Sequence, residues 1–150
     1  MQNVALWLQN SCLTLNLEKT VTMFFTKRHI LKDCPNVSVN GQTIDNVDIF
    51  KYLGVTLDPT LSFKKHVKKL RNTLNFNLAN FRYIRNSLTV EASSMYLNAM
   101  IIPHLLYCIT SWSQSNKTVL KSLESLYKSA LKIHDKKPRR YHHCQILKQI

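Results

Sequence analysis

The spacing of apolar residues changes once along this chain, near Ser62, and that change limits the folds open to it. From there on, apolar residues recur at steps of three and four, the period of one face of an α-helix. They are Phe63, Val67, Leu70, Leu74, Leu78, Phe81, Ile84 and Leu88. Serine is among the residues that commonly cap helix N-termini. The sequence therefore predicts a long amphipathic helix with Ser62 as its N-cap.

Two further helices are predicted downstream. One begins near Thr89 and continues to about Trp112. We expect a kink or a break at Pro103, because proline lacks an amide donor and clashes with the preceding turn. The other helix begins near Lys117, and its apolar face comprises Leu120, Leu123, Tyr127, Ala130 and Leu131. Three apolar faces joined by short connections predict an antiparallel three-helix bundle.

The residues before Ser62 carry strand and turn signals. Val21–Thr26 is rich in β-branched and aromatic residues, which favours a strand. Asn40 and Gly41 lie between two short extended runs, and this dipeptide is typical of a type I′ hairpin turn. The first thirteen residues are compatible with a short amphipathic helix.

One of the two glycines of the chain, Gly54, lies inside another extended run, Val47–Leu57. Glycine inside a strand usually marks a bulge, a bend or a close approach of another backbone. Asp58 and Pro59 should end this run, because proline cannot donate a hydrogen bond to a sheet. The predicted fold class is therefore α+β, a small antiparallel β-element followed by the three-helix bundle.

The composition points to a polyanionic partner. Lysine and arginine number 21 against eight acidic residues, a net charge of +13 in 150 residues. Such an excess favours nucleic acid, although a plainly solvated surface is the alternative. No stretch approaches the ~18 consecutive apolar residues of a membrane span, so no membrane partner is expected. The four cysteines show no paired spacing, which predicts free thiols and an intracellular protein of the nucleus or cytoplasm.

The positive charges form two clusters. The first falls on the long helix, where no acidic residue interrupts the stretch from Leu61 to Ile84, and comprises Lys64, Lys65, Lys68, Lys69 and Arg71. The second lies in the last fifteen residues and comprises Lys136, Lys137, Arg139 and Arg140. We predict that both bind phosphates. The histidines and the single cysteine that follow the second cluster lack the paired spacing of a zinc site, so no metal is predicted.

The order of several short motifs is similar to that in one known family. Asn16-x-x-Lys19-Thr20 is followed by the Asn40-Gly41 turn, by the Lys51–Gly54 segment and by the basic helix. This order resembles the part of non-LTR retrotransposon (LINE-type, jockey-like) reverse transcriptases that follows the catalytic aspartates. The resemblance implies a C-terminal palm remnant over residues 1–60, a thumb-like bundle over residues 61–135 and a basic tail over residues 136–150.

The resemblance also implies roles for particular residues. Lys19 resembles the lysine of polymerase motif D, which is associated with the nucleotide triphosphate. Lys51, Tyr52, Leu53 and Gly54 resemble the primer grip, a β-turn-β hairpin that holds the 3′ end of the primer. The first basic cluster resembles the thumb helix that follows the minor groove of the template–primer duplex. The partner implied is an RNA–DNA or DNA duplex, bound without sequence specificity.

Catalytic residues of the family are missing from this sequence. Its reverse transcriptases hold two metal ions between carboxylates, chiefly adjacent aspartates, and the parent polymerase would use Mg²⁺. No two aspartates are adjacent here: they are Asp33, Asp45, Asp48, Asp58 and Asp135. We therefore expect no catalytic residue, no cofactor in this chain and no polymerase activity. The predicted function is a retroelement polymerase fragment with template–primer binding at most.

Two alternatives remain open at this point. The helical bundle could be a domesticated module that binds nucleic acid or a protein and has no enzymatic role. Segments that resemble Lys51–Trp112 are also grouped with an N-terminal part of tRNA-modifying alkylation-repair homologues. Because no His-x-Asp with a distant histidine is present, iron and oxygenase chemistry is not expected. The tryptophans and phenylalanines lie mainly at apolar positions and are interpreted as core residues.

Overall fold

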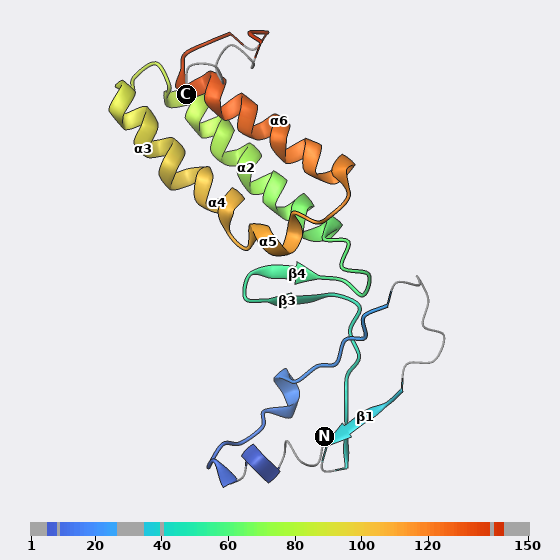
Figure 1. Cartoon of the computed structure of the whole chain (residues 1–150). Coiled ribbons are helices and arrows are strands. Elements are labelled where there is room, and N and C mark those ends of the chain that lie inside the picture. Colours follow the sequence, from blue (N-terminus) through green and yellow to red (C-terminus); the bar gives the residue numbers. More distant parts are fainter. Residues whose placement is uncertain (1–5, 9, 27–34, 40, 139, 143–150) are drawn as a thin grey trace. The chain divides into compact units, whose positions relative to one another are not determined.

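The computed structural model describes residues 6–8, 10–26, 35–39, 41–138 and 140–142, and the chain divides into two units (Figure 1). The first unit is Met1–Ser62 and the second is Phe63–Ile150. The first contains one 3₁₀ turn, η1 Leu17–Lys19, and four strands, β1 Val37–Val39, β2 Gln42–Ile44, β3 Phe50–Tyr52 and β4 Val55–Leu57. The second contains the helices α2 Lys64–Ile84, α3 Val90–Met100, α4 Ile102–Leu106, α5 Ile109–Trp112 and α6 Lys117–His134. The predicted α+β class, strands first and helices after, is confirmed.

The first hairpin forms where the Asn-Gly dipeptide predicts it. Strands β1 and β2 pair antiparallel, with Val39 opposite Gln42, so the loop is two residues long. Gly41 has a φ of +80°, a value that glycine adopts without steric cost. Val39 and Ile44 are both buried. Turn chemistry and the burial of one residue in each strand therefore agree on this register.

The second hairpin, β3–β4, divides the extended run Val47–Leu57 at Leu53 and Gly54, where the resemblance implies a β-turn-β hairpin. Tyr52 pairs with Val55, which leaves Leu53 and Gly54 as a two-residue loop. Both loop residues have positive φ, +43° for Leu53 and +85° for Gly54, as a type I′ turn requires. The leucine hides this turn from sequence reasoning, because Asn or Asp is usual at its position.

The strand predicted over Val21–Thr26 is absent from the structure. Only Thr22 pairs, in a single parallel bridge with Asn46, while the amide of Thr26 donates to the carbonyl of Pro59. A β-strand requires successive hydrogen bonds to one neighbouring strand. Here the amide of Thr22 donates to the carbonyl of Asp45, whereas the amide of Thr26 donates to that of Pro59. The β-forming composition of this segment is a preference that cannot supply a partner strand.

Ser62 is not the N-cap of α2, in contrast to the prediction. Its amide and hydroxyl instead donate to the carboxylate of Asp58, both at 3.0 Å. The same carboxylate accepts from the amide and hydroxyl of Thr60, at 3.1 and 2.7 Å. The N-cap position is occupied by Phe63, in the left-handed region, with no side-chain capping bond. The Ser62 hydroxyl bonds to Asp58 and does not cap the helix, because a carboxylate is a charged and therefore strong acceptor.

Helices α2, α3 and α6 form the predicted bundle, with α3 running opposite to the other two (Figure 1). The buried side of α2 consists of His66, Val67, Leu70, Leu74, Asn77, Leu78 and Phe81. Phe81 stacks on Tyr96 of α3, with 4.6 Å between ring centroids. The side-chain amide of Asn77 donates to the carbonyl of Met100 at 2.7 Å, which satisfies a buried polar group within the bundle.

The middle helix is broken in two places. Thr89 caps α3 as its position suggests, since its hydroxyl accepts from the amide of Ala92. The chain breaks at Ile101, just before Pro103, which confirms the predicted interruption. A second break was not predicted: Cys108 adopts a left-handed conformation between α4 and α5. The long helix α2 also ends earlier than its apolar pattern indicates, so Leu88 lies beyond it.

Two remaining expectations concern the termini and the thiols. Leu6–Leu8 are helical, and the rest of the predicted N-terminal helix lies partly outside the described residues. Cys12 and Cys108 are free thiols, while Cys34 and Cys144 lie outside the described residues. Among the helices that the structure describes, none has the length and apolar content needed to cross a membrane.

Candidate nucleic-acid interface

The net charge of the chain belongs entirely to the helical unit. Residues 1–62 contain five lysines and arginines and five acidic residues. Residues 63–150 contain 16 lysines and arginines and only three acidic residues. Two of those acids are already engaged, because Glu124 pairs with Lys128 and Asp135 pairs with His134. A surface for a polyanion is therefore to be sought on the bundle.

The first predicted basic cluster divides into two rows on α2. Lys64, Lys68 and Arg71 line a cleft of about 280 Å³ together with Thr118 and Ser122 of α6. The spacing of these three cations, four residues and then three, places them on one face of the helix. Lys65 and Lys69 are exposed but do not line this cleft. The structure thus brings three of the five predicted cations together with hydroxyl groups from a second helix.

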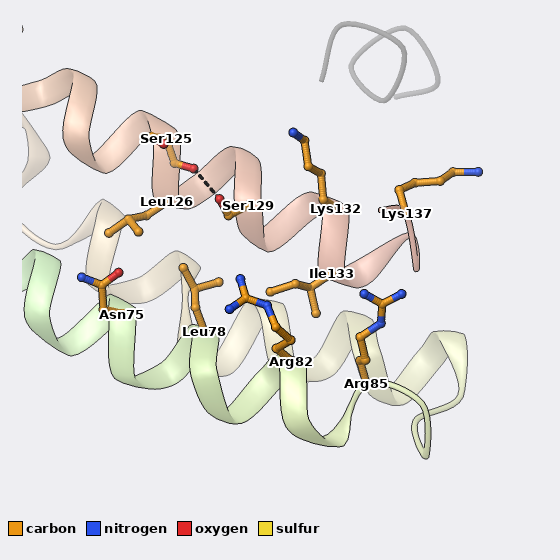
Figure 2. A pocket seen from close by; sticks show the side chains of 10 residues that line it. All are labelled: Asn75, Leu78, Arg82, Arg85, Ser125, Leu126, Ser129, Lys132, Ile133 and Lys137. Carbon is orange, nitrogen blue, oxygen red and sulfur yellow. Dashed lines mark hydrogen bonds between the residues drawn. The ribbon is translucent and has the colours of Figure 1, made fainter. Parts of the chain in front are cut away.

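A larger cleft, of about 580 Å³, lies farther along the same pair of helices (Figure 2). Its lining from α2 is Asn75, Leu78, Arg82 and Arg85, and its lining from α6 and the residues after it is Ser125, Leu126, Ser129, Lys132, Ile133 and Lys137. Four of these ten residues are cationic and none is acidic. In Figure 2 the guanidinium groups of Arg82 and Arg85 extend from α2 toward α6. Sequence reasoning did not single out Arg82, Arg85 or Lys132.

The second predicted basic cluster begins at the C-terminal end of α6. Lys136 has a φ of +54°, and the amides of Lys136 and Lys137 donate to the carbonyls of Ile133 and Lys132. This is the bonding pattern of a Schellman cap with lysine in the usual place of glycine. The ammonium of Lys136 donates to the carbonyl of Leu88, so this side chain has a structural partner.

The rest of that cluster is placed in part. Lys137 lines the larger cleft, and its ammonium lies 5.3 Å from the ring centroid of Tyr141, within cation–π range. Arg140 is exposed, and Arg139 lies outside the described residues. The histidine and cysteine positions 143 and 144 also lie outside them. Lys137 is therefore the residue of this cluster that joins the cations of α2.

Lys19 ends the single 3₁₀ turn η1, and its side chain is exposed. The side-chain oxygen of Asn16 accepts from the amide of Lys19 at 3.1 Å, and the hydroxyl of Thr20 donates to the carbonyl of Asn16 at 2.7 Å. The motif Asn16-x-x-Lys19-Thr20 therefore has a local structural basis, a capped turn. The role that the resemblance implies for Lys19 stays a prediction.

The four residues that resemble a primer grip lie together at one end of the β3–β4 hairpin. Lys51 and Tyr52 are the last residues of β3, and Leu53 and Gly54 form the loop. Leu53 is 72% exposed although its side chain is apolar. The element has the β-turn-β form that the resemblance implies, and the function of these residues stays a prediction.

The described carboxylates do not fit a two-metal centre. Within the described ranges, no three His, Cys, Asp or Glu side chains gather closely enough to hold a metal ion. Asp58, whose carboxylate accepts four hydrogen bonds from Thr60 and Ser62, serves the chain after β4. The Mg²⁺ chemistry of the resembling family therefore has no donor set in this part of the chain, and no step is derived through it.

One hydrogen-bonded chain was missed by sequence reasoning. Nε2 of His134 lies 2.9 Å from the hydroxyl of Ser94, and its Nδ1 lies 2.7 Å from the carboxylate of Asp135. Ser94, His134 and Asp135 thus follow one another like the nucleophile, the base and the orienting acid of a catalytic triad. Acyl transfer also needs donors for an oxyanion, and Ser94 lies inside α3, where amides bond within the helix. We interpret these two hydrogen bonds as a structural link between α3 and the end of α6.

Several aromatic side chains are not core residues, in contrast to the interpretation from the sequence. Phe76 of α2 is 67% exposed, and Trp7 and Phe25 are also exposed. His66 of α2, in contrast, is buried, and its ring centroid lies 6.3 Å from that of Trp112, which is also buried. Burial lowers the pKa of His66, and the positive charge of Lys69 lowers it further. This histidine is therefore held neutral inside a basic surface.

Comparison with known proteins gives relatives of one kind. The chain is 26% identical over 129 residues to the "RNA-directed DNA polymerase from mobile element jockey" of Drosophila funebris, and 27% identical over 129 residues to that of Drosophila melanogaster. It is 24% identical over 135 residues to the "Probable RNA-directed DNA polymerase from transposon BS" of Drosophila melanogaster. These matches cover 84% to 88% of this chain but only 14% to 15% of the relatives. No family model and no solved structure matches. The resemblance to LINE-type, jockey-like polymerases is confirmed.

Proposed function

We propose that this chain, which is similar over most of its length to RNA-directed DNA polymerases of jockey-type elements, is a nucleic-acid-binding segment of such a protein. It corresponds to the part after the catalytic aspartates, with a palm-derived β unit and a thumb-like bundle. Binding is directed at the phosphate backbone of a template–primer duplex and does not depend on base sequence. The helical unit supplies the contacts.

The observation that carries this proposal is the basic groove between α2 and α6. We give this name to the two clefts and their cations, which are Lys64, Lys68, Arg71, Arg82, Arg85, Lys132 and Lys137. Serine and threonine side chains of α6 line the same clefts, and no lining residue is acidic. Arginine, lysine and hydroxyl side chains are the groups that contact phosphates in protein–nucleic-acid complexes. A groove of this composition binds a backbone and does not read bases.

A salt-titrated gel shift with the full chain tests the proposal. Several groove cations each releasing a counterion should weaken binding to an RNA–DNA hybrid by roughly a thousandfold between 50 and 200 mM salt. Two hybrids of unrelated sequence should bind equally. Absence of a shift at 50 mM salt and about 0.1 mM protein would remove the proposal, because non-specific affinities are tighter than this.

We further propose that the chain by itself does not polymerise. Two-metal phosphoryl transfer requires carboxylates that place both ions, and the aspartates of this sequence are all isolated from one another. A primer-extension assay with Mg²⁺ or Mn²⁺ should show no incorporation above a buffer control. Incorporation that depends on the protein would overturn this part of the proposal and leave the binding part standing.

A further inference from the structure

The larger cleft lies outside both basic clusters that the sequence marks on α2 and after α6, with only Lys137 in common. Arg82 and Arg85 come from the last turns of α2, and Lys132 and Lys137 come from the end of α6 and the residues after it. Arg82 and Lys132 are fifty residues apart in the sequence. Their approach depends on α2 and α6 running side by side in the same direction (Figures 1 and 2).

Arg85 has an unmet bonding requirement in this cleft. Its Nε is buried and makes no hydrogen bond to any residue that the structure describes. Buried donors are nearly always paired, because leaving one unpaired has the full cost of its desolvation. No ion pair within the described part of the chain involves Arg82 or Arg85. The site therefore holds a buried donor, Arg85 Nε, that has no acceptor among the described residues.

The chemistry of the lining specifies the missing acceptor. Both helices end near this cleft, and helix C-termini carry partial negative charge, so the peptide dipoles do not attract an anion here. Attraction must come from the side chains, and four cations without an acid provide it. Arginine forks match phosphate oxygens in two-bond geometry, and the hydroxyl of Ser125 adds a polar contact, whereas the hydroxyl of Ser129 already donates to the carbonyl of Ser125. Leu78, Leu126 and Ile133 give an apolar wall suited to a sugar.

We propose that this cleft binds phosphates of a nucleic-acid strand that continues along the basic groove from the Lys64, Lys68 and Arg71 cleft. Arg82 follows Lys68 by fourteen residues, which corresponds to about 21 Å along a helix. A strand of a duplex places one phosphate every ~3.4 Å, so about six phosphates separate the two contact points. The inference rests on the proposed function and deepens it, because it makes Arg82 and Arg85 a second contact point for the same strand, outside the clusters that the sequence marks.

The test compares two variants of the full chain that lose the same charge. Arg82→Gln with Arg85→Gln removes two cations of the cleft. Lys117→Gln with Lys121→Gln removes two exposed cations of α6 that line neither cleft. Binding of a fluorescent 20-nucleotide DNA strand, annealed to its RNA complement, is measured by anisotropy from 50 to 300 mM NaCl. We expect the cleft variant to bind at least tenfold more weakly at 100 mM NaCl, with a salt slope shallower by about 2 because two phosphate contacts are lost. The control should keep the wild-type slope.

The outcomes separate this inference from the proposed function. Equal slopes for both variants would overturn the cleft as a contact point while leaving nucleic-acid binding intact. No binding by the wild-type chain would remove the proposed function itself. Inorganic triphosphate provides the other arm: if it binds the wild type more tightly than the strand does, and the cleft variant loses only triphosphate, the site serves a free phosphate compound and not a strand.

A structural role for Arg85 is checked in the same proteins. Its Nε has no hydrogen-bond partner among the described residues to lose, so the cleft variant should keep the wild-type circular dichroism spectrum and melting temperature. Adding the strand should raise the melting temperature of the wild type and the control more than that of the cleft variant. Should the double variant unfold, Arg82→Gln alone, at an exposed position of α2, should still show a shallower slope. Its having the wild-type slope would overturn the inference.

Discussion

The two units of this chain differ in charge and in what holds them together. The unit of residues 1–62 is neutral, and its described residues contribute three buried apolar side chains, Val39, Ile44 and Val55. The unit of residues 63–150 carries all of the net charge, and thirteen of its described residues are buried apolar side chains. Local polar bonds and turns therefore hold the first unit, whereas a packed core holds the second. The proposed phosphate-binding surface lies on the unit that has the packed core.

The largest expected effect tests the core of the helical unit. Phe81 is fully buried against Tyr96, so Phe81→Ala should cost about 3–5 kcal/mol of unfolding free energy, measured by urea denaturation followed at the helical dichroism band. Phe76→Ala is the matched control, because Phe76 lies on the same helix and is 67% exposed; it should change stability by no more than about 0.5 kcal/mol. Similar costs for both would contradict the division of this helix into buried and exposed faces.

The next effect tests whether polar bonds hold the β unit. Asp58→Ala removes an acceptor of four hydrogen bonds from Thr60 and Ser62, and should cost about 1–3 kcal/mol locally. Amide exchange of residues 55–62 should accelerate accordingly in a hydrogen-exchange experiment. Asp48→Ala, at an exposed acidic position of the same unit, should leave these rates unchanged. Unchanged rates in the Asp58 variant would mean that another interaction holds this segment.

A smaller gain is expected at the β3–β4 turn. Leu53 holds a positive φ that disfavours a leucine, and Asn is preferred at this position of a type I′ turn. Leu53→Asn should stabilise the hairpin by about 0.5–1 kcal/mol, seen as slower amide exchange in β3 and β4. Leu53→Ala lacks the polar side chain with which asparagine tolerates this φ, and should give no such gain. If both substitutions slow exchange equally, the backbone conformation of Leu53 is not what limits the hairpin.

The smallest effect concerns acid stability of the helical unit. The pKa of His66 is lowered in the folded chain by burial and by Lys69, so between its folded and unfolded pKa values the unfolded chain binds more protons. Stability should therefore be unaffected by this group above about pH 6.5 and should fall as the pH drops below that value. The melting temperature of the wild type should decrease more from pH 7.5 to pH 5.5 than that of His66→Gln. The same decrease in both proteins would contradict a neutral, buried His66.

Much of the helical unit could be predicted because the apolar spacing of a helix is a long, repeated signal. The face from Val67 to Phe81 and the start of α6 at Lys117 both follow from it, and Pro103 and Thr89 mark local chemistry that holds in the structure. The first hairpin can be predicted for a similar reason, since the dipeptide Asn-Gly is typical of a type I′ turn. These signals are local in the sequence.

The predictions of a strand at Val21–Thr26 and of a cap at Ser62 fail because a distant or competing hydrogen-bond partner determines the conformation of these residues. Val21–Thr26 has the composition of a strand but no strand pairs with it, and Ser62 bonds to Asp58 where capping was expected. The larger cleft could not be foreseen, because Arg82 and Lys132 meet only once two helices pack. Phe76 was interpreted as core because an apolar residue type does not state which side of a helix it occupies.

The two-residue loops of both hairpins have a kinetic consequence. Each strand pair joins residues that are near neighbours in the sequence, with no long loop to close first. Such ribbons zip in about 1–10 μs, so Val37–Leu57 can reach its pairing long before a bundle with partners fifty residues apart has assembled. During synthesis on the ribosome, these two-stranded ribbons can therefore form and reopen many times while the helices that follow are still emerging.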